Sequence, residues 1–280
     1  MFKINIFLKR LKLTRWLPLV SIFLSFNICA QKIVKVGMAQ IFCLDSDKSG
    51  NLRRIENAVL ESKEQGAEIV VFPEMALVGW VNPDAHHLSK PIPGEDSDFL
   101  AQLAKKYSVY ICIGLGEKEG DKLYDSALLI SDEGNILLKH RKNNILTELM
   151  EPSYSKGNGV QVVQTKFGKI GVMICADTFK EDLIQQMSEL KPDLMLIPYG
   201  WAAKVDEWPE HGKELHGVVK NISERIKCPA IGVDLVGQIS KGPWKGLTYG
   251  GQSVAYSKSA ELVHISKDRD KDIVVLEIEL

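Results

Sequence analysis

The sequence has no excess of charge that would draw the chain to a nucleic acid or to an anionic membrane. Its 280 residues hold 35 Lys and Arg against 36 Asp and Glu, so the formal net charge is −1. Nucleic-acid-binding proteins carry basic patches interleaved with aromatic residues, and the sequence contains no such patch. We therefore expect no nucleic acid among its partners.

Cysteines are few, and no two of them lie at the C-x-x-C spacing. The sequence contains 5, and Cys43, Cys112, Cys175 and Cys228 are the ones that follow the first thirty residues. Their long and irregular gaps indicate neither a zinc site nor a dense disulfide framework. Most of them lie in apolar runs, where a buried thiol is the common outcome.

No group of histidines and acids has the spacing of a metal site. The pair His86 and His87 and the pair His211 and His216 have no carboxylates at matching intervals. The segment Asp45–Glu56 places several oxygen ligands at the positions of a calcium loop, but a predicted strand precedes it where such a loop needs a helix. We expect no bound metal, and we interpret this segment as a polar loop that caps the next helix.

The first thirty residues have the composition of a targeting segment. Residues 1–15 carry five basic side chains and no acid, and residues 16–30 form an apolar run that ends in a small residue, Ala30. This order predicts a signal peptide cleaved after Ala30, and hence a periplasmic or secreted protein. An uncleaved membrane anchor is the alternative, whereas Phe26-Asn27-Ile28 is a poor context for lipid attachment at Cys29.

The remaining residues, 31–280, are expected to form one domain, since they contain no repeat, linker or low-complexity tract. Apolar strand-like runs alternate with amphipathic helices, and two pairs of strands read as hairpins. Helices are predicted in the segments Asn51–Gly66, Asp96–Ser108, Phe179–Pro192 and Trp208–Cys228. So many strands with so few helices predict an α/β protein in which two mixed sheets pack face to face with helices outside.

Three strand ends carry polar residues that a buried strand does not need. Glu74 ends the run Val-Val-Phe-Pro, Lys142 ends a second run, and Cys175 ends a third. Each has an ordinary interpretation: an acid that returns the chain to water, a lysine in a basic run, or a core thiol. Together they make a nucleophilic set, in which the thiolate attacks, the carboxylate moves protons and the ammonium stabilises an oxyanion. Lys142 and the start of the helix predicted after Cys175 would both favour the thiolate.

These segments resemble the nitrilase, or carbon–nitrogen hydrolase, superfamily. The glutamate motif of that family is similar to VVFPEMALVGW, its lysine motif to GNILLKHRKNNI, and its cysteine motif to GVMICAD. Their order along the chain and the gaps between them also fit, as do IPYGW and the late segment GGQSVAYSKSAELV. The resemblance covers nearly all of residues 32–280.

The resemblance implies a four-layer αββα sandwich that pairs as a homodimer. It implies hydrolysis of a non-peptide C–N bond in a small amide or carbamoyl substrate through a cysteine thioester, with nitriles as a rarer substrate and no cofactor. It assigns Glu74, Lys142 and Cys175 to catalysis. It further implies a second glutamate, for which Glu151 fits the motif better than Glu148, and supporting or substrate-binding roles for Ala176, whose backbone N–H would assist at the oxyanion, and Trp201.

The chain also departs from the family pattern. Asn143-Asn144 follow Lys142 where His-Leu is common, His140 fills an aromatic position, Ala176 replaces a frequent aromatic residue, and Asp125 stands where asparagine is usual. These departures leave open a non-catalytic member that binds an amide or a partner. An acyltransferase that uses the same three residues is a further alternative, although the chain lacks the multiple membrane spans of the lipoprotein acyltransferases.

Overall fold

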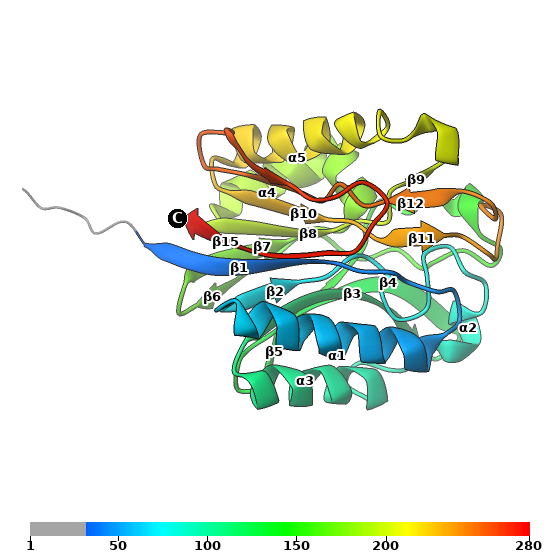
Figure 1. Ribbon diagram of the computed structural model, residues 1–280. Helices are drawn as coiled ribbons and strands as arrows, with labels where there is room; N and C mark the ends of the chain where they lie inside the picture. Colours follow the sequence, from blue (N-terminus) through cyan, green and yellow to red (C-terminus); the bar gives the residue numbers. More distant parts are fainter. Residues whose placement is uncertain (1–31) are drawn as a thin grey trace, which may run out of the picture. The chain divides into compact units, whose positions relative to one another are not determined.

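The computed structural model describes residues 32–280, and the predicted signal peptide lies outside them. The described chain forms two six-stranded mixed sheets that stack on each other, with helices on both outer faces (Figure 1). This arrangement confirms the prediction of a four-layer α/β sandwich. Among the described residues, no helix is long and apolar enough to cross a membrane.

The first sheet has the strand order β15-β1-β2-β3-β4-β5. Its strands β1, β2 and β3 run parallel, whereas β4 and β15 are antiparallel to their neighbours. The bounds are β1 (Ile33–Gln40), β2 (Ile69–Val71), β3 (Tyr110–Glu119), β4 (Lys122–Ile130), β5 (Ile136–Arg141) and β15 (Asp272–Glu279). Because β5 is antiparallel to β4, which is antiparallel to β3, the carboxyl ends of β2, β3 and β5 lie at the same edge of the sheet.

The second sheet has the order β14-β13-β10-β8-β7-β6, with β7, β8 and β10 parallel. The bounds are β6 (Val162–Thr165), β7 (Gly168–Val172), β8 (Leu194–Pro198), β10 (Ala230–Val233), β13 (Val254–Tyr256) and β14 (Leu262–Ile265). A third, small sheet of order β11-β12-β9 was not predicted. Its strands are β9 (Ala202–Ala203), β11 (Val236–Gln238) and β12 (Thr248–Gly250), which are too short to give an alternating pattern.

Two long helices cover each outer face of the sandwich (Figure 1). Helices α1 (Lys48–Glu64) and α3 (Glu95–Tyr107) pack on the first sheet, and α4 (Glu181–Leu190) and α5 (Gly212–Ile226) pack on the second. One apolar core fills the space between the sheets and continues beneath α4 and α5, while another lies between the first sheet and α1 and α3. The buried face of α1 consists of the predicted residues Ile55, Ala58, Val59 and Ser62, together with Gly50 and Asn51 at its start.

Asp47 caps α1, since its side chain accepts a hydrogen bond from the Gly50 N–H. The short helix α2 (Ala85–Leu88) and the 3₁₀ helices η1 (Thr147–Leu149) and η3 (Val205–Glu207) lie in connections.

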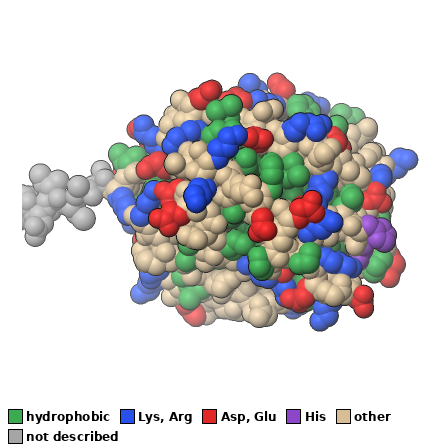
Figure 2. Space-filling view, turned by 90° about the horizontal axis from the view of Figure 1, so that it is seen from below, with side chains coloured by type: hydrophobic (Ala, Val, Ile, Leu, Met, Phe, Trp, Pro, Cys, Tyr) green, Lys and Arg blue, Asp and Glu red, His purple; other side chains and the backbone are tan. Residues whose placement is uncertain are grey.

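Figure 2 shows the face that carries α1 and α3, where basic and acidic side chains are interspersed. That face offers no surface of a single charge sign to a polyanion.

The segment around Cys175 differs from the sequence-based expectation. Strand β7 ends at Val172, and Cys175 begins a 3₁₀ helix, η2 (Cys175–Phe179), so the cysteine does not end the strand directly. The expected helix, α4, starts only at Glu181. The first residue of α4 therefore lies six positions after Cys175 in the chain, and the 3₁₀ helix η2 lies between them.

Candidate active site

The polar residues predicted at three strand ends come together at one edge of the sandwich. Glu74 follows β2, Lys142 directly follows β5, and Cys175 follows β7. All three side chains are buried, with exposed fractions of 0%, 4% and 4%. Removing a carboxylate, an ammonium and a thiol together from water costs folding free energy. Their convergence therefore points to chemistry rather than to stability.

Glu74 is held by close packing of backbone against backbone. Its N–H donates a hydrogen bond of 3.1 Å to the carbonyl of Tyr199, which follows β8 in the other sheet. On its other side β3 passes so near that a Cβ added to Gly114 would lie 2.5 Å from the Glu74 Cα. Glycine is required at position 114 because no side chain fits between the two segments.

Lys142 lies between two buried carboxylates. Its Nζ contacts Glu74 Oε1 and lies 3.4 Å from Asp125 Oδ2, and its backbone N–H donates to the Asp125 carbonyl over 2.8 Å. Burial alone would lower the pKa of Lys142, but the negative charges of Glu74 and Asp125 outweigh burial, and the pKa stands well above its ordinary value. The lysine is therefore a fixed cation in the site.

Cys175 occupies a strained backbone conformation, since its φ of 39° lies in the left-handed region although it has a side chain. Thr178 secures the turn by donating from its hydroxyl to the Cys175 carbonyl over 2.6 Å. Burial and then the charge of Glu74 raise the pKa of the thiol well above its usual value, and Lys142 offsets them only in part. The resting group is thus a thiol, whereas the sequence predicted conditions that favour the thiolate.

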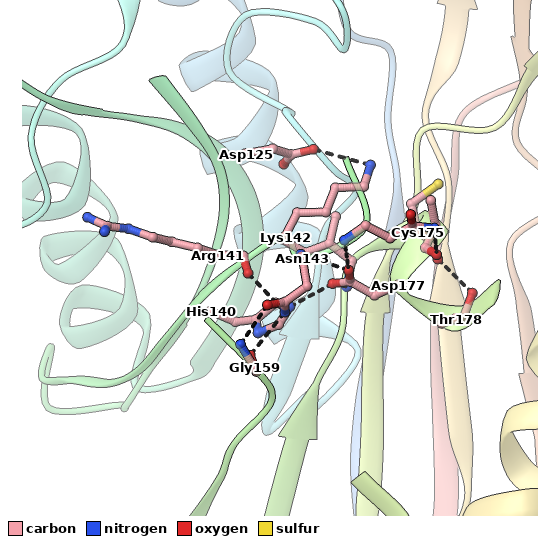
Figure 3. A network of polar contacts seen from close by, with 12 residues as sticks. Asp125, His140, Arg141, Lys142, Asn143, Gly159, Cys175, Asp177 and Thr178 are labelled. Carbon is pink, nitrogen blue, oxygen red and sulfur yellow. Dashed lines mark hydrogen bonds and ion pairs between the residues drawn. The ribbon is translucent and has the colours of Figure 1, made fainter. Parts of the chain in front are cut away.

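Asp177 joins the cysteine turn to the lysine loop. Its carboxylate accepts hydrogen bonds from His140 Nε2 and from the backbone N–H groups of Asn143 and Asn144, each over 2.8 Å, and from the Ile174 N–H over 3.2 Å (Figure 3). Burial opposes its ionisation, but these donors, led by His140, hold the pKa of Asp177 below its usual value. The carboxylate is a brace between the segments that carry Lys142 and Cys175.

This brace gives a structural reason for two departures from the family pattern. The Asn144 side chain donates to the Ala176 carbonyl over 2.7 Å, and the Asn143 side chain donates to the Gly159 carbonyl over 3.0 Å. From the sequence alone, the two asparagines and His140 are only substitutions in the family pattern. Their contacts with the cysteine turn required knowledge of which loops meet.

Neither candidate for the second glutamate is buried with the converging residues. Glu151 and Glu148 are both exposed, and among residues 32–280 neither makes a hydrogen bond or an ion pair. The carboxylate that joins Glu74 at Lys142 is Asp125, which is wholly buried. Sequence spacing favoured Glu151, but β4 lies beside β5 in the sheet and carries Asp125 directly to the lysine.

Ala176 and Trp201 lie beside the converging residues. Ala176 follows the nucleophile candidate and is buried. Gly200 passes Glu74 closely, since an added Cβ would lie 3.0 Å from Glu74 Oε2, and Trp201 follows it. The Trp201 indole stacks on His211 with ring centroids 5.4 Å apart, and the Trp201 backbone N–H donates to Asp234 Oδ1 over 2.6 Å.

A small, mostly apolar cavity borders Lys142. Its volume is about 10 Å³, and it is lined by Trp80, Val81, Lys142, Ile145, Leu146, Leu149, Met150, Ser153 and Tyr154. That volume holds about one water molecule. Among the described residues, no group of three or more His, Cys, Asp or Glu is arranged to hold a metal ion, and the four described cysteines are free thiols.

Comparisons with known proteins extend over almost the whole described chain. The sequence model of the carbon–nitrogen hydrolase family matches residues 35–280. A nitrilase from Pyrococcus abyssi is 28% identical over 257 residues, which cover 89% of this chain and 90% of that protein. An omega-amidase from Xenopus tropicalis is 29% identical over 180 residues, which cover 61% of this chain and 64% of that protein.

The fold has counterparts among solved structures. A carbon–nitrogen hydrolase from Helicobacter pylori G27 superposes with a TM-score of 0.77 at 20% sequence identity, covering 88% of this chain and 89% of that one. At this identity the structural likeness concerns the fold alone.

Proposed function

The chain belongs to the carbon–nitrogen hydrolase family of the nitrilase superfamily, and from this membership we propose that it hydrolyses a small non-peptide amide or carbamoyl compound through a thioester on Cys175. The observation that carries the proposal is the burial of Glu74, Lys142 and Cys175 against one another. In the interior a carboxylate and an ammonium act on a thiol without competition from water.

In the first half of the reaction, Cys175 acylates. The Glu74 carboxylate takes the thiol proton as the sulfur attacks the carbonyl carbon, which matters because the pKa of the thiol is raised and little thiolate exists at rest. Lys142 and the backbone N–H of Ala176 stabilise the oxyanion. Glu74 then gives its proton to the departing nitrogen, and the C–N bond breaks to leave a thioester.

In the second half, water releases the acid. Glu74, again a carboxylate, takes a proton from a water molecule, whose oxygen attacks the thioester carbon. The oxyanion of the second tetrahedral intermediate is stabilised by Lys142, as the oxyanion of the first was. Its collapse breaks the C–S bond, the sulfur regains a proton from Glu74, and the carboxylic acid leaves.

The cavity beside Lys142 supports a small acyl group. Its walls are mainly Trp80, Ile145, Leu149 and Met150, and the charge of Lys142 is already matched by carboxylates. A bulky acyl group would find no room there. A panel of short-chain amides, N-carbamoyl amino acids, ω-amides and nitriles is the direct way to identify the substrate.

The proposal is tested with intact-mass measurements during turnover of the best substrate in that panel. The wild type should show a mass increase equal to the acyl group, and Cys175→Ala should show neither the increase nor turnover. Glu74→Gln should stay folded and fail to acylate, because the amide cannot accept the thiol proton. Full activity of Cys175→Ala, or normal acylation of Glu74→Gln, would contradict these roles.

Transfer to an amine is separated from hydrolysis by the products. With an added amine acceptor, a hydrolase releases the free acid, whereas an acyltransferase makes the new amide. A non-catalytic member would yield neither product and would take up no electrophilic label at Cys175.

The location and assembly of the protein are further parts of the proposal. The basic segment, apolar run and small residue within residues 1–30 support export. Family membership supports a homodimer, which light scattering on the purified protein would measure directly.

A further inference from the structure

Asp125 is a buried carboxylate that the reaction above does not use. It lies on β4, it has no exposed surface, and its Oδ1 has no hydrogen-bond partner. The second oxygen of the Glu74 carboxylate, Oε2, is buried and equally without a partner. Two unsatisfied oxygens therefore belong to the two carboxylates that share one lysine.

An unsatisfied buried oxygen is costly, and a single proton removes the cost for both groups. Two carboxylates cannot hydrogen-bond to each other, but a protonated carboxyl can donate to a carboxylate. Like charges held together in the interior force one of the pair to remain protonated. Burial and then the charge of Glu74 raise the pKa of Asp125 well above its usual value, and the charge of Lys142 offsets them only in part.

We propose that Asp125 is a positioning residue that holds the Lys142 ammonium in place and shares one proton with Glu74. The inference rests on the proposed function for its kinetic consequence but not for its effect on stability. It assigns to Asp125 the second carboxylate contact that the sequence motif assigned to a glutamate, since Glu148 and Glu151 are both exposed.

The proton sets the charge of the site. The titratable groups that face Asp125 are Glu74, Lys142 and, through the charge of these two, Cys175 and the buried Tyr154. With the proton on Asp125, one carboxylate balances one ammonium and the site is neutral. Glu117 on the neighbouring strand is already engaged by Lys139, Arg141 and Ser126, so it does not enter this balance.

Loss of that proton has a predictable direction. As pH rises and Asp125 ionises, the site acquires a second negative charge that Lys142 cannot balance. That charge opposes both the thiolate and the oxyanion. The kcat/KM of the wild type should therefore fall on the alkaline side.

The test compares Asp125→Asn and Asp125→Ala with the wild type. Asp125→Ala removes the contact to Lys142 and should lower kcat on the order of 10²-fold, because the ammonium is no longer held in position. Asp125→Asn keeps an acceptor for Lys142 but cannot ionise, so it should recover most of that loss and extend activity by roughly one pH unit on the alkaline side. Asp121→Asn, on the exposed turn of the same hairpin, is the matched control.

Thermal unfolding supplies a readout that needs no turnover. The folded-state pKa of Asp125 is raised, so the folded protein binds this proton more tightly than the unfolded chain does. Stability from this group is fully present below the unfolded pKa of about 3.9 and is lost as pH rises towards the folded value. The Tm advantage of Asp125→Asn over the wild type should therefore grow as pH rises above about 4.

These two readouts separate the possible failures. Without measurable turnover in any protein, the proposed function fails, and the Tm comparison still decides whether Asp125 holds the proton. A Tm difference that does not change with pH would overturn the shared proton, as would superimposable pH profiles of the wild type and Asp125→Asn. Wild-type kcat in Asp125→Ala would overturn the positioning role.

Discussion

Lys139 and Lys142 lie in the same basic run, but their surroundings are opposite. The Lys142 side chain is 4% exposed and held by Glu74 and Asp125, whereas the Lys139 side chain is 31% exposed and pairs with Glu117 over 2.6 Å. From the sequence alone, either lysine fits a charged strand end. Strand alternation separates them in the structure, because β5 ends at Arg141 and Lys142 then turns inward.

At the residue scale we predict that Lys142→Ala and Lys142→Arg lose most turnover while the fold stays intact. Loss of an oxyanion donor costs on the order of 10²–10³ in kcat, and a planar guanidinium cannot replace a compact ammonium between two carboxylates. Lys139→Ala is the control and should turn over substrate near the wild-type rate. Steady-state kinetics with circular dichroism would check this, and equal rates for all three variants would place the catalytic lysine elsewhere.

The three converging residues could be predicted from the sequence, but the residues that surround them could not. Glu74, Lys142 and Cys175 lie in local motifs, so a reading along the chain finds them. Asp125 lies 17 residues from Lys142 and meets it only because β4 and β5 pair. Partners that depend on strand register and loop packing leave no signal in a single sequence.

At the element scale, the turn that carries Cys175 is fixed to the loop after β5. Four donors converge on Asp177, two of them backbone N–H groups of residues that directly follow Lys142. Asp177 therefore ties the two segments to each other, which holds the ammonium and the thiol in their relative positions. The sequence predicted a strand followed at once by a helix, and it gave no sign of the 3₁₀ turn between them.

We predict that Asp177→Asn destabilises the protein by about 1–3 kcal/mol, because the amide nitrogen faces buried N–H donors. The charge also links stability to pH. The folded pKa of Asp177 is depressed, so its contribution is present above the unfolded pKa of about 3.9 and is lost as pH falls through the lower folded value.

Thermal unfolding of Asp177→Asn and of the control Asp182→Asn, an exposed position on α4, would measure the effect. The control should unfold with the wild type. The rate of Cys175 alkylation by iodoacetamide should change in the first variant only. An Asp177→Asn protein as stable as the control would show that the brace contributes nothing.

A second prediction at this scale concerns the contact between β3 and the Glu74 loop. In Gly114→Ala the new Cβ would lie 2.5 Å from the Glu74 Cα and 2.8 Å from the Pro73 carbonyl oxygen, so backbone must move. Overpacking of this kind costs about 1–3 kcal/mol, and displacement of the base should lower kcat on the order of 10²-fold.

The matched control is Gly217→Ala on α5, where nothing lies within 4 Å of the added Cβ. Alanine in place of glycine in an exposed helix should raise stability by about 0.5–1 kcal/mol and leave turnover unchanged. Chemical denaturation and kinetics on both variants decide the matter. Unchanged turnover in Gly114→Ala would mean that the Glu74 loop tolerates displacement.

At the scale of the whole molecule, the architecture followed from the order of strands and helices. Two hairpins and alternating helices predicted two mixed sheets, and the structure confirms them. The small sheet of β9, β11 and β12 was missed because strands of two or three residues show no periodicity. Strand β12 pairs with both β11 and β9, and β9 is distant from β12 in the sequence. Only the folded chain brings these strands together.

The last prediction concerns the part of the sequence that precedes this domain. The family match starts at residue 35, and the first strand of the described residues starts at Ile33. We propose that the exporting host removes these residues and that the mature protein begins at Gln31. Intact-mass measurement of protein recovered from that host would show the new terminus.

The cut depends on a small residue at position 30, since signal peptidase accepts small side chains before the scissile bond. Ala30→Arg should therefore block cleavage, and residues 1–30 should stay attached in the measured mass. Lys32 is the second residue after the predicted cut, and Lys32→Ala should be processed like the wild type. A native protein whose mass still includes residues 1–30 would refute cleavage and favour a membrane anchor, which detergent-dependent extraction of the same sample would reveal.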